Sequence, residues 1–449
     1  MPVIPPVASA VSPHQLEVAK TLLQVGCFLV IFLAARIICE LTVRLQLPTI
    51  LGELVAGVLI GASGLHLIVP PDLQAQLSDG AARLVGALAE IGPDAVREVY
   101  ATTFPNLEAI SEIGLFSLLF LTGLESELDE LVAVGGQATT VAITGVVLPF
   151  ALGTAGLVYG FHLPLIPAVF AGAAMTATSI GITASVFGEL RWLKRREGQI
   201  VIGAAVLDDI LGIVILAVVV AIVGGGAFSV GPLVKLCVAA VAFVAVALVL
   251  SRTAAPLFDW VVDRLKAPGD VAVASFLVLT LCCFAAQAIG LEAALGAFAA
   301  GLILSASKHT ADIDKAVKPL VALFATVFFV LIGTGMDLSV LNPFNPANRE
   351  GLIVAAFLLV VAIIGKVASG WSYLSKEPTR RLVVGLGMMP RGEVGLIFLG
   401  LGSQAHILTP SLEAAILLMV IGTTFLAPIL LRLVIGKDAT VACSAELPS

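Results

Sequence analysis

The sequence contains few charged residues: they occupy 12% of its 449 positions, whereas 59% of the residues are hydrophobic. A soluble domain has about a quarter charged residues. This deficit and a mean hydropathy of +1.09 exclude an ordinary soluble protein. Apolar runs close to the ~20 residues that span a bilayer recur along the chain. Because these runs are continuous rather than alternating, they predict an all-α polytopic membrane protein and disfavour a β-barrel.

Signals for several other classes of protein are missing. Five of the six cysteines lie in apolar runs, where cysteine behaves as a small hydrophobic residue, so no disulfide framework is predicted. No Cys and His spacing suggests a metal cluster, and we expect no cofactor. The net charge of −7 argues against a nucleic-acid partner. Residues 1–15 lack a basic region before their apolar residues, so we interpret them as an N-terminal tail and not as a signal peptide.

We predict thirteen membrane-spanning helices, followed by a C-terminal tail at 436–449. The predicted helices are residues 16–43, 48–69, 110–127, 131–160, 164–189, 197–223, 232–251, 270–289, 291–306, 317–337, 351–374, 380–402 and 411–435. Residues 70–109 mix apolar and charged residues at helical spacing. We interpret them as an extracytoplasmic insertion of one or two short amphipathic helices, which serves as a surface connector; a gate or regulatory site is the alternative.

Lysine and arginine residues orient the predicted helices. One set of alternate loops contains Arg44, Arg191, Lys194, Arg195, Arg196, Arg252, Arg264, Lys266, Lys308, Lys315, Lys318, Lys376, Arg380, Arg381, Arg432 and Lys437. The opposite set contains only Lys20, Arg83, Arg97, Lys235 and Arg349. The positive-inside rule places the first set in the cytoplasm. We therefore expect the N-terminus outside and the C-terminus in the cytoplasm.

The chain contains a candidate internal repeat. The segments "LGELVAGVLIGAS" (Leu51–Ser63) and "LGAFAAGLILSAS" (Leu295–Ser307) share six of thirteen residues. They lie seven predicted helices apart, and because seven is odd, matching helices run in opposite directions. This pattern predicts the inverted-topology repeat of many secondary transporters. Chance similarity between membrane helices, which use few residue types, is the alternative.

The repeat pairs helix 164–189 with helix 380–402, and both are predicted to be discontinuous. The first contains Thr176, Thr178 and Ser179 near its middle, where hydroxyls can satisfy backbone groups freed by unwinding. The second contains Pro390 among closely spaced glycines. Substrate sites in such folds lie where discontinuous helices meet. A simple kink at Pro390 is the alternative.

Five ionisable residues lie deep within predicted helices: Asp208, Asp209, Lys366, Arg391 and Glu393. Each costs at least ~2.5–3.5 kcal/mol at a helix centre on insertion scales. Contacts that only hold helices together are one interpretation, but three acids and two bases leave one negative charge. A buried unpaired charge takes up a proton or finds a counter-ion. One proton or one monovalent cation would neutralise the cluster, so the two would compete for one site.

Asp208 and Asp209 are neighbours on one helix, and their side chains point about 100° apart. One can therefore face Lys366 while the other faces a cavity. This geometry disfavours an intramembrane aspartic protease, the alternative from the enzyme class, because that chemistry needs two carboxylates that share a proton.

Six motifs in sequence order resemble those of the monovalent cation/proton antiporters, in the branch of bacterial sodium/proton exchangers and potassium efflux systems. They are "LPTILGELVAGVLIGASGL", "LFSLLFLTGLESEL", "TATSIGITASVFGEL", "GAAVLDDILGIV", "ALGAFAAGLILS" and "GMMPRGEVGLI". The resemblance covers residues 16–435. It implies a homodimer in a bacterial inner or internal membrane, with core helices within 131–223 and 351–435 and dimerisation or scaffold helices within 16–127 and 232–337.

The resemblance also implies site residues and an activity. Asp209 looks like the residue that binds the monovalent cation and the proton, Asp208 looks like the partner of Lys366, and Thr178 lies where the unwound helix offers oxygens. Arg391 and Glu393 match the charged pair of the family's twelfth helix, with Thr176 and Ser179 nearby. The implied activity is exchange of a monovalent cation for protons by alternating access. Na⁺ is the first expectation, and K⁺ or Li⁺ remains open.

Two departures from the family pattern refine this expectation. The insertion at 70–109 is longer than the usual connector. The chain also lacks the soluble nucleotide-binding domain of glutathione-gated potassium efflux systems, which favours a simple exchanger over a proton-uncoupled K⁺ efflux pathway. Because the chain keeps both Asp208 and Lys366, we expect two protons per cation and electrogenic exchange. A purely structural Lys366 with one-for-one exchange is the alternative.

Overall fold

The computed structural model describes residues 12–45, 47–126, 128–223, 230–264, 270–336, 348–373, 378–391 and 407–445, together with residues 395, 398, 399 and 402. These residues form helices joined by turns, and no strand occurs among them. The chain divides into two compact units: Met1–Leu115 with Val321–Ser339, and Phe116–Leu320 with Val340–Ser449. The division falls within two long helices, α4 (Pro93–Glu125) and α14 (Thr310–Thr334).

The first unit is built around α1 (Pro13–Arg44). Ser12 begins this helix with a capping box, in which its hydroxyl accepts the Gln15 backbone N–H and the Gln15 side chain accepts the Ser12 N–H. Leu23 and Cys27, one turn apart, bury one face of the helix. The unit's other elements are α2 (Thr49–Ile60), the 3₁₀ turn η2 (Pro71–Gln76), α3 (Asp79–Ala89), the first part of α4 and the second part of α14.

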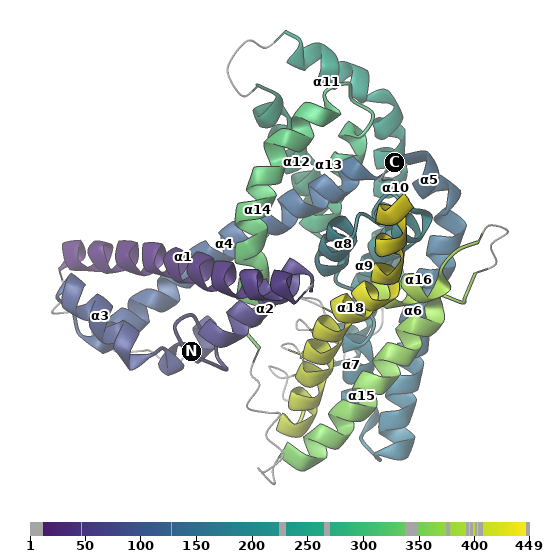
Figure 1. The fold of residues 1–449 in the computed structure, drawn as a ribbon. Helices are drawn as coiled ribbons and strands as arrows, with labels where there is room; N and C mark the ends of the chain where they lie inside the picture. The colour runs from purple at the N-terminus through teal and green to yellow at the C-terminus, as the bar shows by residue number, and fades with distance from the viewer. Residues whose placement is uncertain are drawn as a thin grey trace. The chain divides into compact units, whose positions relative to one another are not determined.

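The second unit contains the second part of α4, the first part of α14 and the remaining helices. The remaining helices are α5 (Leu128–Ala133), α6 (Gly135–Ala155), the π-helical turn η3 (Gly156–Gly160), α7 (Leu165–Ala174), α8 (Ile180–Glu189), α9 (Arg196–Val223), α10 (Val230–Thr253), α11 (Ala255–Val262), α12 (Asp270–Ala288), α13 (Ala293–Leu304), α15 (Asn348–Ser369), α16 (Arg381–Gly387) and α18 (Pro410–Ala445). Helix α15 packs along both α6 and α18 (Figure 1). Its buried Leu358 and Ala362 share an apolar cluster with Met419 of α18, and this packing holds α15 against α18.

The repeated segments take the same form in both copies. α2 and α13 are each 12 residues long and are each followed by a turn. Gly57 of α2 lies against α14, where an added Cβ would be 2.1 Å from the Val330 carbonyl oxygen. The equivalent Gly301 of α13 lies against α4, where an added Cβ would be 2.0 Å from the Phe120 carbonyl oxygen. The spans predicted at 110–127 and 317–337, which largely lie in α4 and α14, are also seven spans apart and so correspond in the repeat. The same close backbone approach therefore occurs twice, as an internal duplication predicts.

Seven helices in the described part of the chain are long and apolar enough to cross a membrane, or eight if the bent pair Ala245–Thr253 and Ala255–Val262 counts as one. Shorter apolar helices occupy other predicted spans, namely α2, α7, α8 and α13. The span predicted at 48–69 stops being helical at Ile60, because a turn closes it and the backbone N–H groups of Leu67 and Ile68 both donate to the Ile60 carbonyl.

The structure corrects the boundary of the span predicted at 110–127. Those residues are the second part of α4, which begins at Pro93 and continues through Pro105. A proline removes one backbone donor and crowds the preceding turn. Burial of Phe104 and Leu107 beside it favours the helix nevertheless. Of the two amphipathic helices allowed for 70–109, one is therefore α3, and the other is the start of α4.

The predicted core ranges, 131–223 and 351–435, fall entirely within the second compact unit. The predicted scaffold ranges, 16–127 and 232–337, are shared between the two units. Compactness alone does not separate parts that move from parts that stay, so the division into core and scaffold stays a prediction.

Candidate ion-binding site at two broken helices

The predicted break in helix 164–189 separates α7 from α8. α7 ends at Ala174 and α8 begins at Ile180, and the residues between them are not helical. Thr176, Thr178 and Ser179 lie in this break, and each is at most 3% exposed. Helix ends leave backbone groups without partners inside the helix. At the end of α7, the Ala173 carbonyl accepts both the Thr176 backbone N–H at 3.0 Å and the Thr176 hydroxyl at 2.7 Å.

A second break follows α16, and it contacts the first. Residues 388–391 are not helical. Three hydrogen bonds join the breaks: Ser179 N to the Pro390 carbonyl at 2.9 Å, Thr178 Oγ1 to the Met388 carbonyl at 3.0 Å, and Arg391 Nη1 to the Ala177 carbonyl at 2.7 Å. A fourth joins the flanking helices, from Thr183 Oγ1 of α8 to the Gly387 carbonyl of α16 at 2.9 Å. The prediction of two discontinuous helices that meet is therefore confirmed.

A buried ion pair lies beside this contact. The Lys366 ammonium is 2.8 Å from Asp208 Oδ2, and neither side chain is exposed. The same ammonium donates to Thr178 Oγ1 at 2.8 Å. Lys366 is in the last turn of α15, where the partial negative charge of the helix end favours a cation. A carboxylate, a hydroxyl and a helix end thus compensate the desolvation of one ammonium.

Some buried polar atoms at the site have unused hydrogen-bonding capacity. Within the described ranges, Asp208 Oδ1, Ser179 Oγ, and Nε and Nη2 of Arg391 have no hydrogen-bond partner. A buried polar atom without a partner is costly. Carboxylate and hydroxyl oxygens are the ligands that hard cations prefer. Asp208 on α9 and Ser179 in the first break therefore each have an oxygen acceptor that a small cation or a proton could use.

Comparisons with known proteins decide the family. Residues 28–436 match the family model described as "Sodium/hydrogen exchanger, transmembrane". The high-affinity Na⁺/H⁺ antiporter NhaS3 of Synechocystis sp. is 46% identical over 437 residues, which are 96% of this chain and 94% of that protein. The Na⁺/H⁺-K⁺ antiporter GerN of Bacillus cereus is 29% identical over 92% of this chain and 97% of its own length. The chain belongs to the sodium/hydrogen exchanger family.

A solved structure carries the same fold. The sodium proton antiporter MjNhaP1 of Methanocaldococcus jannaschii superposes with a TM-score of 0.59, at 18% identity, over 92% of this chain and 96% of that one. Membership of the exchanger family confirms the predicted antiporter fold and the prediction of an integral membrane cation/proton antiporter, not an enzyme. It removes the aspartic protease alternative.

The structure gathers most of the predicted site residues of this exchanger. Asp208, Thr178 and Lys366 form one hydrogen-bonded group, and Arg391 and Ser179 contribute to the contact between the breaks. Thr176 bonds only within its own turn. Asp209 follows Asp208 on α9 and is partly buried. Glu393 lies outside the described residues. The roles assigned to these residues stay predictions.

Two further residues at the exchanger's site were not singled out from the sequence. The buried Thr424 of α18 donates to the Arg391 carbonyl at 2.6 Å and so supports the second break. Gly145 of α6 lies against Lys366, where an added Cβ would be 3.4 Å from Nζ. Thr424 had a weak signal, as one of two adjacent threonines within an apolar span; Gly145 had none, because glycine is common in membrane helices.

Proposed function

We propose that this exchanger transports Na⁺ against protons by alternating access, with K⁺ or Li⁺ as further cations to be tested. The 46% identity to a protein named as a high-affinity Na⁺/H⁺ antiporter, over nearly the full length of both chains, carries the choice of Na⁺. The relative named as a Na⁺/H⁺-K⁺ antiporter is the reason to test K⁺ with equal care.

We assign the alternating binding of cation and proton to Asp209. Asp208 is already committed, because one of its oxygens accepts the Lys366 ammonium in a pair with no exposed surface. Asp209 projects about 100° further around α9 and is less deeply buried. A cation that enters from water would therefore reach the Asp209 carboxylate before that of Asp208. Thr178 and Ser179 would add oxygens from the first break.

Transport in liposomes tests this assignment. The purified protein is reconstituted, and internal pH is followed while Na⁺, K⁺ or Li⁺ is added outside. Proton movement coupled to one cation identifies the exchange and its ion, whereas cation flux without proton movement would indicate uncoupled efflux. Asp209→Asn should abolish exchange without changing thermal stability. The exposed Asp263 gives the control Asp263→Asn, which should transport normally. Substantial coupled exchange by Asp209→Asn would contradict the assignment.

We further propose an electrogenic cycle in which Lys366 carries a second proton. Binding of a cation at Asp209 draws Asp208 away from Lys366, the ammonium loses its counter-charge, and a proton leaves. An imposed membrane potential should then drive exchange without an ion gradient, and Lys366→Gln should remove that response. Exchange by the unmodified protein that ignores the potential would mean that Lys366 only holds helices together.

The proposed assembly is a homodimer with an external N-terminus, a cytoplasmic C-terminus and core helices that shift across the bilayer. The basic loop at 191–196 is predicted to lie in the cytoplasm, and Lys194 in this loop is exposed. In a background without native cysteines, Lys194→Cys should react with an impermeant maleimide only in inside-out vesicles. Reaction in right-side-out vesicles would reverse the orientation. The mass of the purified protein, corrected for detergent, tests the dimer.

A further inference from the structure

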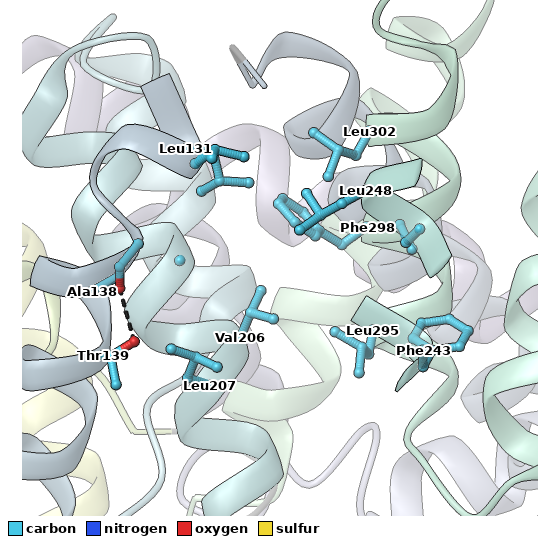
Figure 2. Close-up of a pocket in the computed structure, with 15 residues that line it drawn as sticks. Leu131, Ala138, Thr139, Val206, Leu207, Phe243, Leu248, Leu295, Phe298 and Leu302 are labelled. Carbon is cyan, nitrogen blue, oxygen red and sulfur yellow. Dashed lines mark hydrogen bonds between the residues drawn. The ribbon is translucent and has the colours of Figure 1, made fainter. Parts of the chain in front are cut away.

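A cavity of about 300 Å³ lies between two groups of helices in the second unit (Figure 2). Leu131 of α5 and Leu207 of α9 line one side, together with residues of α6. Phe243 of α10 and Phe298 of α13 line the other side. Leu207 directly precedes Asp208 in the sequence. The cavity therefore borders the segment of α9 that carries the buried ion pair.

The described part of the cavity wall is almost entirely apolar. Thr139 supplies the only hydroxyl among the residues that line it, and this hydroxyl donates to the Gly135 carbonyl at 2.8 Å. The remaining lining residues are apolar side chains and glycines. Figure 2 shows the leucine and phenylalanine side chains around the space. An ion or a lipid headgroup would lose its hydration here and gain at most one hydroxyl oxygen, so the wall favours an apolar occupant.

The cavity is continuous with the apolar surface of the protein. Val132 lines it and is also 49% exposed. Ala247 and Leu248 line it from α10, and their neighbours Val246 and Val249 are exposed on the same helix. In a chain that spans a membrane, exposed apolar side chains of the spanning helices face lipid hydrocarbon. An acyl chain could enter from this surface and gain the contacts that an empty void forfeits.

We propose that this cavity binds one acyl chain of a bilayer lipid between α5, α6 and α9 on one side and α10 and α13 on the other. Its volume is at the lower end of the range of ligand pockets, which fits a single chain and not a whole lipid. Any effect of the bound acyl chain on transport rests on the proposed exchange cycle, in which the core helices shift relative to the scaffold helices. A chain held between the predicted core range 131–223 and the scaffold range 232–337 would stabilise the conformation that contains the cavity.

Two adjacent glycines provide a matched pair of positions for the test. Gly135 lines the cavity and Gly136 does not, and both lie in the first turn of α6. An added Cβ meets nothing within 4 Å at either position. Gly135→Leu therefore places a leucine side chain in the cavity without a backbone clash. Gly136→Leu adds the same side chain beside it but outside the cavity.

The experiment uses the full chain reconstituted with phosphatidylcholine that carries a photoreactive diazirine on one acyl chain. After illumination, mass spectrometry locates the labelled residues. We expect labels on the cavity residues of the unmodified protein and of Gly136→Leu, and several-fold fewer on those of Gly135→Leu. Labelling of the exposed Leu277 on α12 should be equal in all three proteins. The smaller filling variant Gly135→Ala should give an intermediate loss.

Two results would overturn the proposal. One is an absence of label on the cavity residues of the unmodified protein while Leu277 is labelled. The other is equal labelling of the cavity residues in the Gly135→Leu and Gly136→Leu variants. Because labelling requires no transport, a failure here is distinguishable from a failure of the proposed exchange, which the liposome assay measures separately.

Discussion

Removal of either partner from the buried ion pair should destabilise the protein, and removal of both should largely restore it. Asp208→Asn leaves the Lys366 ammonium without a counter-charge, and Lys366→Met leaves the Asp208 carboxylate without one. Both groups have 0% exposed surface, so neither can turn to water. Breaking a buried pair by removing one partner typically costs about 3–5 kcal/mol, whereas replacing both charges is often close to neutral.

These free energies correspond to measurable shifts of the melting temperature. An unfolding entropy of about 2.1 cal/mol/K per residue gives about 0.9 kcal/mol/K for a chain of this length, so each single variant should melt about 3–5 °C lower. The double variant Asp208→Asn/Lys366→Met should melt within about 2 °C of the unmodified protein. The melting temperatures of all four proteins are measured by thermal unfolding in detergent, followed by intrinsic fluorescence. One fixed scan rate is used throughout, because such unfolding is commonly irreversible and the melting temperature then depends on the scan rate.

An exposed ion pair provides the control for this cycle. Lys308 bonds Asp263 at 2.5 Å, and both side chains are about half exposed. The Lys308 ammonium lowers the pKa of Asp263 through this hydrogen bond. Solvent screens such a pair, so Asp263→Asn, Lys308→Met and their combination should leave the melting temperature unchanged. A double variant of Asp208 and Lys366 destabilised by the sum of its single variants would refute the reasoning, because the two charges would then act independently.

Three further predictions concern close contacts at the repeat and at the breaks. Gly57→Leu and Gly301→Leu should each abolish a folded, monodisperse peak in size-exclusion chromatography, because the added Cβ meets a backbone carbonyl oxygen; a normal peak from either would contradict the duplicated approach. Thr178→Val removes the hydroxyl that joins Lys366 to the second break, so liposome exchange should fall at least tenfold, whereas Thr176→Val, whose hydroxyl bonds only within its own turn, should stay near normal. Thr424→Val leaves a buried carbonyl without its donor and should lower the melting temperature by about 1–3 °C, while Thr424→Ser should not; equal shifts would remove the hydrogen bond as the cause.

Much of the fold was predictable because hydropathy and helix breaks are local signals. The apolar runs located the helices, and hydroxyl-rich or proline-containing segments within them located both breaks. The start of α4 was not predictable by the same means. Its first turns are amphipathic, and Pro105 by itself indicates a helix end. Only the burial of Phe104 and Leu107 in the folded unit overrides that signal.

The candidate site was predictable where charge appears in an apolar helix or where several hydroxyls cluster in one, as at Thr178 and Ser179. Asp208 and Lys366 are conspicuous for the first reason, although they are 158 positions apart. Thr424 and Gly145 have no comparable signal, because hydroxyls and glycines are frequent in membrane helices. The backbone carbonyls that accept hydrogen bonds from Thr178 and Arg391 give no sequence signal at all, since every residue has a backbone carbonyl. Such contacts depend on how the two broken helices meet, which no local pattern encodes.

The geometry of Asp208 gives a physical reason for coupling between two ions. One oxygen holds Lys366 and the other has no hydrogen-bond partner in the described part of the chain, so the carboxylate is only half used. Under the proposed cycle, a cation at the neighbouring Asp209 would weaken the hold of Asp208 on Lys366. Crossing the hydrocarbon with the cluster uncompensated is costly, at least ~2.5–3.5 kcal/mol for each unpaired charge. Under the proposed cycle, only the proton-loaded and cation-loaded states would avoid that cost, and a protein that moved only when loaded would exchange its two ions instead of leaking either one.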